Sequence, residues 1–171
     1  DHTEIPFGMI LDGIHVAPEL VRLAWHYQGN RRLTLVTDAC AALGMPAGSY
    51  QLGNHEIKVD GLSARLGDGT LAGSTLTPLK ALQNLQSFTK CSFQEALACL
   101  QRAEPLLQGS GDPACLGLLL CQHAMAAAQL GEVKAGRSLL ERAQLLLRPL
   151  GLAEATAAGR ALAAAGQLLV G

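Results

Sequence analysis

The chain has 171 residues, of which 49% are hydrophobic and 16% are charged, and its formal net charge is −1. This composition is typical of a globular chain and excludes an intrinsically disordered one. The balanced charge gives no electrostatic reason to expect a nucleic-acid partner, which usually needs a basic surface. The stretch closest to a membrane span, from Pro113 to Leu130, is interrupted by polar residues, so we expect a core helix there and no membrane association.

Cysteine usage bears on the compartment of the protein. The five cysteines include no Cys-x-x-Cys pair and show no zinc-ligand spacing with a histidine. An odd number of cysteines without a signal peptide favours free thiols in a reducing, cytoplasmic environment. The chain opens at Asp1 without an initiator methionine and enters an apolar run almost at once, so we expect a fragment of something longer.

Two short apolar runs flank a predicted helix near the N-terminus. The run from Pro6 to Ile10 and the β-branched run from Leu33 to Thr37 are each typical of a buried strand. Between them, Pro18 favours the first turn of a helix, which we expect to end at Gly29 and Asn30. A strand, a helix and a strand with short joints form a βαβ unit, so the two strands should be parallel.

Polar residues follow both of these predicted strands. Asp12 and His15 follow the first strand and Asp38 follows the second, so they should converge at one edge of the sheet. Ligands bind at that edge in parallel α/β proteins, which favours a catalytic role for Asp38. The alternative is that Asp38 only caps a helix in the alanine-rich run after it, because Asp is a good N-cap residue.

The pattern after Asp38 predicts a small antiparallel β excursion. Three short segments of alternating polarity are separated by Gly-Asn and Asp-Gly pairs, which favour hairpin turns. Gly73 follows another turn, and a glycine there lets a backbone approach a ligand closely while neighbouring amides meet an anion. A helix should begin at Pro78, with Ser74 or Thr77 as its cap.

From Pro78 onward the sequence predicts helices only. An apolar stripe that starts at Phe93 should stop near Pro105, and a break rich in Gly and Ser precedes Pro113. Three further helices should follow, over Leu116 to Leu130, Val133 to Leu147 and Ala153 to Leu169. We therefore predict a first domain at residues 1–105 and an alanine- and leucine-rich tail of helical hairpins at residues 106–171.

The helical part contains one internal similarity. The segment from Ser92 to Ala103 aligns with the segment from Glu132 to Ala143, with apolar, small, leucine, arginine and alanine positions in register. This resembles a degenerate tetratricopeptide helix pair, although any antiparallel alanine-rich hairpin gives similar matches. A tail of this kind would bind a protein partner or form a homo-oligomer.

Three motifs stand in order in the first domain. They are Asp12-Gly13-Ile14-His15, the run from Leu33 to Ala39, and Gly69-Thr70-Leu71-Ala72-Gly73-Ser74. Together with the residues that link them, these motifs resemble the N-acetylglucosamine-6-phosphate deacetylases of the amidohydrolase superfamily. The resemblance runs from about residue 5 to Leu97.

The resemblance implies a fold and a reaction. The fold is an α/β one, a (β/α)8 barrel with a small β domain, and this chain would hold its last two barrel strands. The reaction is hydrolysis of the N-acetyl amide of N-acetylglucosamine 6-phosphate to glucosamine 6-phosphate and acetate, a step of amino sugar metabolism. Asp38 would take a proton from a metal-bound water and later protonate the leaving amine. Substrate contacts would come from Asp12, Gly13, Ile14 and His15 and from the closing loop of Leu71, Ala72 and Gly73.

The resemblance also implies a divalent metal ion, zinc or iron. Its glutamate and histidine ligands are expected upstream of this chain. Two βα units hold too little of a barrel that needs about 250 residues, so we expect the chain to be an incomplete enzyme by itself. The alternative is a non-catalytic helical interaction module that carries a relic of the barrel.

Overall fold

The computed structural model describes residues 5–40, 42–43, 45–129, 131–151 and 157–170. The chain divides into two compact units, Asp1–Leu100 and Gln101–Gly171. The division falls before residue 105, where the sequence predicts the boundary of the first domain. Within the described residues, no helix is both long enough and apolar enough to span a membrane.

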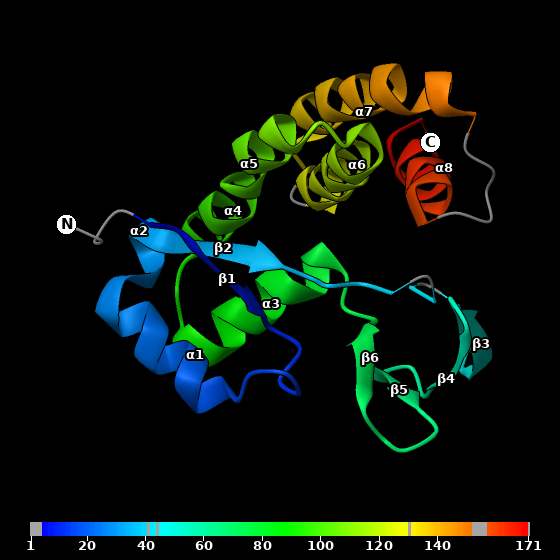
Figure 1. Ribbon diagram of the computed structural model, residues 1–171. Coiled ribbons are helices and arrows are strands. Elements are labelled where there is room, and N and C mark those ends of the chain that lie inside the picture. The colour runs from blue at the N-terminus through cyan, green and yellow to red at the C-terminus, as the bar shows by residue number, and fades with distance from the viewer. Residues whose placement is uncertain (1–4, 41, 44, 130, 152–156, 171) are drawn as a thin grey trace. The chain divides into compact units, whose positions relative to one another are not determined.

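The first unit opens with the predicted βαβ arrangement (Figure 1). Strand β1 (Phe7–Ile10) pairs in parallel with β2 (Leu33–Val36), in a register that sets Ile10 opposite Val36. The helix α1 (Pro18–Ala24) begins at the predicted proline. The predicted helix end at Gly29 and Asn30 is wrong, because a π-helical turn, η2 (Trp25–Gly29), continues into α2 (Asn30–Arg32), which runs directly into β2.

The antiparallel excursion is a four-stranded sheet. Its strands β3 (Gly48–Leu52), β4 (His55–Val59), β5 (Ser63–Leu66) and β6 (Leu71–Ser74) pair in sequence order. Alternation along β4 buries Ile57 and Val59 while their neighbours stay exposed, as a strand with one covered face requires. These two side chains pack with Ala64, and Cys40 and Ala42 from the segment after β2 complete the cluster.

Helix α3 (Pro78–Thr89) covers the β1–β2 layer and contacts both α1 and β2 (Figure 1). Its cap is Thr77, whose hydroxyl accepts a hydrogen bond from the Lys80 amide at 3.1 Å. Leu82 and Leu85 are fully buried on its inner face. The next helix, α4 (Phe93–Gln101), begins with a reciprocal capping pair, because Ser92 and Glu95 each accept a hydrogen bond from the other's amide.

The described part of the second unit is helical. It comprises α5 (Ala103–Ser110), α6 (Pro113–Gln129), α7 (Val133–Leu147), the 3-10 turn η3 (Arg148–Leu150) and α8 (Ala157–Val170). The predicted stop near Pro105 is wrong, because the chain turns at Arg102 and Pro105 lies in the first turn of α5, where proline is tolerated. Residues 152–156, where the sequence predicts the start of the last helix, lie outside the described residues.

Small residues let α6, α7 and α8 approach closely. The buried core of this unit consists mainly of leucine and alanine side chains from these three helices. A Cβ atom at Gly117 would lie 2.4 Å from Leu147 Cδ2, and one at Gly136 would lie 3.0 Å from the Ala124 carbonyl oxygen. Arg142 of α7 pairs with Glu104 of α5 at the surface. The five cysteines all lie in the described part of the chain, and none of them forms a disulfide there. Three of them are buried, namely Cys40, Cys99 and Cys121.

The close approach at Gly136 can be tested against a glycine in open surroundings. We expect Gly136→Ala to lower the free energy of unfolding by about 1–3 kcal/mol, since the backbone carbonyl of Ala124 cannot move aside cheaply. Gly166 lies in α8 with nothing within 4 Å of its would-be Cβ, so Gly166→Ala should instead stabilise by up to about 1 kcal/mol through helix propensity. Urea denaturation measures both, and a stabilising Gly136→Ala would contradict the packing described.

Candidate active site

Asp38 lies just beyond the carboxyl end of β2, in an unusual backbone conformation. Its φ is +46°, in the left-handed region that few residues other than glycine adopt. Its side chain is exposed, and Ala39 forms a bridge to Ser74 instead of starting a helix. Between Ala39 and Gly48 no helix begins among the described residues, which exclude 41 and 44. The structure thus gives no support to the alternative in which Asp38 caps a helix.

Ser74 makes three hydrogen bonds to the backbone around Asp38. Its amide donates to the Asp38 carbonyl at 2.8 Å, and its own carbonyl accepts from the Cys40 amide at 3.0 Å. Its hydroxyl donates to the Thr37 carbonyl. Ser74 is fully buried, so these bonds are shielded from competing water. They fix the end of β6 against the turn that carries Asp38.

Gly73 makes this contact sterically possible. Its φ is +83°, and a Cβ there would lie 3.0 Å from the Asp38 carbonyl oxygen and 3.2 Å from Cys40 Cβ. The close approach that glycine permits is therefore to this chain's own backbone. The Ser74 amide donates to the Asp38 carbonyl and so does not face an anion. The Ser74 hydroxyl donates to the Thr37 carbonyl and does not cap α3, whose cap is Thr77.

The second group of predicted site residues forms a tight turn after β1. One oxygen of the Asp12 carboxylate, Oδ1, accepts from the amides of Ile14 and His15, both at 2.8 Å. The other oxygen, Oδ2, lies 2.6 Å from His15 Nδ1. The Asp12 side chain is 5% exposed and that of His15 is 18% exposed. Gly13 occupies the turn at φ +79°, a conformation that suits glycine.

The hydrogen bonds in this turn keep Asp12 ionised. Burial by itself raises the pKa of the Asp12 carboxyl, but the hydrogen bond to His15, the two amide hydrogen bonds and the attraction to His15 outweigh it and lower the pKa. A carboxylate that is ionised can only accept hydrogen bonds, so His15 Nδ1 is the donor of the side-chain pair.

The strand register brings the two groups to one edge of the sheet. Ile10 is paired with Val36, so Asp12 and Asp38 follow the ends of parallel neighbours at the same offset. Asn84 of α3 anchors the first turn by donating to the Leu11 carbonyl at 2.7 Å. Two supporting residues, Ser74 and Asn84, were not predicted as parts of this site. Asn84 carries no sequence signal for this role, because its partner lies 73 positions earlier.

The remaining predicted residues lie around these two turns. Leu71 and Ala72 are half-buried on β6, next to Gly73, and Ile14 is exposed on the first turn. No group of three or more His, Cys, Asp and Glu side chains, taken over the described residues, is placed to hold a metal ion. Asp12 and His15 hydrogen-bond to each other, so the site as described does not fit the implied metal.

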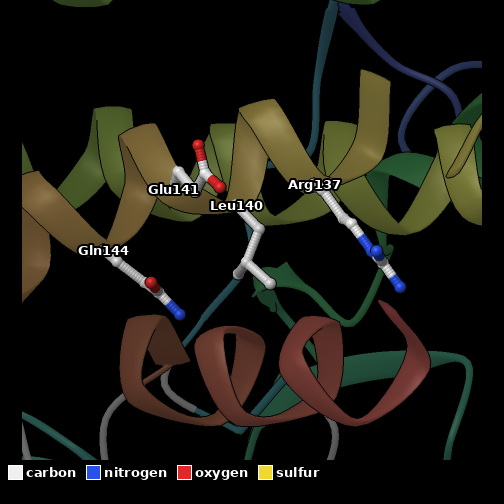
Figure 2. A pocket seen from close by; sticks show the side chains of 4 residues that line it. All are labelled: Arg137, Leu140, Glu141 and Gln144. Atoms are coloured by element: carbon white, nitrogen blue, oxygen red, sulfur yellow. The ribbon is translucent and has the colours of Figure 1, made fainter. Parts of the chain in front are cut away.

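The second unit has a hollow of its own beside α7, shown in Figure 2. Arg137, Leu140, Glu141 and Gln144 line it, and Figure 2 shows Leu140 pointing toward α8. Arg137 Nε donates to the Leu169 carbonyl at 3.1 Å, near the end of α8. A cation in this position caps a helix C-terminus favourably, so we interpret these residues as helix packing.

Comparison with known proteins shows which proteins the chain is similar to. No protein-family profile matches the chain. The chain is 39% identical over 94 residues to an N-acetylglucosamine-6-phosphate deacetylase of Bacillus subtilis, and 42% identical over 92 residues to one of Bos taurus. These alignments cover 55% and 53% of the chain. Over about half its length, the chain is similar to N-acetylglucosamine-6-phosphate deacetylases.

Solved structures agree with the sequence comparison. A deacetylase of this name from Thermotoga maritima superposes with a TM-score of 0.50 at 40% identity, over 53% of the chain. A mutant deacetylase from Mycobacterium smegmatis, in complex with N-acetyl-D-glucosamine-6-phosphate, gives a TM-score of 0.50 at 38% identity, over 55% of the chain. The chain spans about a quarter of the length of the deacetylases it matches: 24% and 22% of the two curated relatives, and 25% of each structure.

The close approach at Gly73 gives a prediction with an internal control. Gly69 and Gly73 have similar φ angles, +89° and +83°, but a Cβ at Gly69 would meet nothing within 4 Å. We expect Gly69→Ala to cost about 1–2 kcal/mol of stability through backbone strain alone. Gly73→Ala should cost about 1–3 kcal/mol more, because it also clashes with Asp38 and Cys40. Equal costs in urea denaturation would refute the tight contact.

The lowered pKa of Asp12 predicts a pH dependence. A carboxyl whose pKa is lower in the folded state stabilises the fold at pH values above its ordinary pKa of 3.8. That contribution is lost as the pH falls through the lower, folded-state pKa. We therefore expect Asp12→Asn to be less stable than the wild type at pH 7, with the difference shrinking below pH 3.8. Urea unfolding at about pH 7 and pH 3 measures this, and a pH-independent difference would contradict it.

Proposed function

We propose that this chain is a segment of an N-acetylglucosamine-6-phosphate deacetylase and supplies the acid/base Asp38. The observation that carries the proposal is the hydrogen bonding between Ser74 and the backbone around Asp38, which joins two of the three motifs in which the sequence resembles the deacetylases. The third motif, with Asp12 and His15, follows the paired strand at the same edge. A strained backbone held by buried hydrogen bonds is typical of a functional position.

The proposal includes a fold larger than the chain. β1 and β2 would be the last two strands of a (β/α)8 barrel, and their parallel pairing supports this. Exposed apolar side chains on α1 and η2 also support it, because Leu20, Leu23 and Tyr27 recur at helical spacing and are 52%, 66% and 82% exposed. Such a row on one helix face is typical of a contact surface.

The chemistry assigned to this chain is a proton transfer. In hydrolysis of the N-acetyl amide, the oxygen of water bonds to the carbonyl carbon and its proton passes to the Asp38 carboxylate. When the C–N bond breaks, Asp38 returns the proton to the amine nitrogen, giving glucosamine 6-phosphate and acetate. Asp38 suits this shuttle because its carboxylate is exposed while its backbone is fixed. No step through a metal ion is assigned, since the described residues do not fit one.

Substrate contacts are proposed for the residues around Asp38. The turn from Asp12 to His15 would hold the sugar at the strand ends, and Leu71, Ala72 and Gly73 would close over it from β6. A non-catalytic helical interaction module is not favoured, because the similarity to deacetylases covers about half of the chain.

A chimeric enzyme tests the proposal directly. Residues 5–97 of this chain would replace the matched segment of the Bacillus subtilis deacetylase, and acetate release from N-acetylglucosamine 6-phosphate would be measured. We expect an active chimera, in which Asp38→Asn lowers kcat by about 10²–10⁴-fold because the proton shuttle is lost.

The matched control is Asp60→Asn. Asp60 also accepts hydrogen bonds from the amides two and three residues further on. However, it follows β4 of the antiparallel sheet, whereas Asp12 and Asp38 follow the parallel strands β1 and β2. Its substitution should leave kcat within about twofold of the parent chimera, which is well short of the effect of losing a proton shuttle. Equal activity of the parent chimera and Asp38→Asn would overturn the catalytic assignment.

A further inference from the structure

The geometry of the first turn points to a role for Asp12 other than substrate binding. We infer that Asp12 is a positioning residue that fixes the protonation pattern of the His15 ring. Its carboxylate holds the proton of the neutral imidazole on Nδ1, so that Nε2 presents a lone pair to a hydroxyl group of the bound sugar. The assignment of a sugar as the ligand rests on the function proposed above, whereas the ring pattern itself does not.

The hydrogen bonds of Asp12 carry this inference. Oδ1 is occupied by two backbone amides at 2.8 Å, which orient the carboxylate and leave Oδ2 facing the ring. Oδ2 then lies 2.6 Å from Nδ1, within hydrogen-bond distance of a ring N–H donor. Three donors thus use most of the acceptor capacity of this carboxylate. Asp12 is therefore committed to the turn, and the ring nitrogen that remains for a ligand is Nε2.

The turn is anchored well enough to hold the ring in one orientation. Asn84 of α3 fixes the Leu11 carbonyl at 2.7 Å, and Leu11 is fully buried. A Cβ at Gly13 would lie 3.6 Å from Phe88 Cζ, so the turn packs against the same helix. The hydrogen bond made by one ring nitrogen of a histidine decides which form the other presents. In the neutral form of the ring, that choice leaves Nε2 as an acceptor, which suits a hydroxyl donor.

The chain offers a matched control for this role. Asp60 makes the same local turn as Asp12, because its Oδ1 accepts from the amides of Leu62 and Ser63 at 2.8 and 2.7 Å. The residue three positions after Asp60 is Ser63, whereas the residue three positions after Asp12 is His15. Asp60→Asn therefore makes the same chemical change as Asp12→Asn in an equivalent turn that holds no histidine.

The experiment is ¹⁵N NMR of the full chain labelled at its histidines, recorded at a pH at which the imidazole rings are neutral. Long-range proton–nitrogen correlations then report which ring nitrogen carries the proton. We expect His15 of the wild type to be protonated on Nδ1. In Asp12→Asn, a side-chain NH₂ replaces Oδ2 opposite Nδ1, so the Nδ1-protonated fraction should fall about tenfold. Asp60→Asn should leave it unchanged.

Each outcome decides the inference. A wild-type His15 protonated mainly on Nε2, or equally on both nitrogens, overturns it without reference to any variant. The same follows if Asp60→Asn changes the His15 pattern as much as Asp12→Asn does. Correct folding of each variant is checked by the unchanged signals of His26, His55 and His123, which lie outside this turn.

A second measurement separates this inference from the proposed function. N-acetylglucosamine 6-phosphate is added to the histidine-labelled chimera that carries residues 5–97, and the Nε2 signal of His15 is followed. A shift of Nε2 that is absent in Asp12→Asn supports both the ring pattern and the sugar ligand. An Nδ1-protonated ring whose Nε2 does not respond overturns the sugar as ligand and leaves the positioning role of Asp12 standing.

Discussion

The clamp formed by Ser74 is the interaction on which the candidate site depends. A single buried residue bonds to the backbone of Thr37, Asp38 and Cys40, and so joins the end of β6 to the end of β2. These bonds hold Asp38 at a φ of +46°, in the left-handed region that aspartate visits only occasionally. The exposed side chain of Asp38 is thereby carried on a fixed backbone, as the proposed acid/base role requires.

The two turns of the site are stabilised in different ways. The turn of Asp38 is held from outside by a strand that comes later in the chain. The turn of Asp12 is built mostly from its own hydrogen bonds and is then anchored by Asn84 of α3. The parallel register of β1 and β2 relates the two turns, since it sets the ends of both strands at the same level. The pairing of β1 with β2 therefore sets where Asp12 and Asp38 lie along the sheet edge, and side-chain hydrogen bonds fix the backbone around each of them.

Local sequence patterns predicted strands and helices correctly where an element depends mainly on its own residues. The parallel strand pair, the antiparallel segments and the helix from Val133 to Leu147 follow from apolar periodicity and turn residues, and the structure confirms them. Local pattern failed at Gly29 and Asn30, where a π-helical turn continues the helix that these residues were expected to end. It failed also at Pro105, because a proline in a first turn begins a helix as readily as it ends one.

For the site, the sequence by itself determined which residues stand at the strand ends and which family they resemble. Order and spacing along the chain were enough for that, because Asp12, His15 and Asp38 each follow an apolar run directly. Only the tertiary structure decided what holds them. The Ser74 clamp and the Asn84 anchor join residues 37 and 73 positions apart. The bonds of Asp12 are local, since its partners Ile14 and His15 lie two and three residues further on. The partners of Ser74 and Asn84, by contrast, are set by the packing of whole elements, which no local pattern encodes.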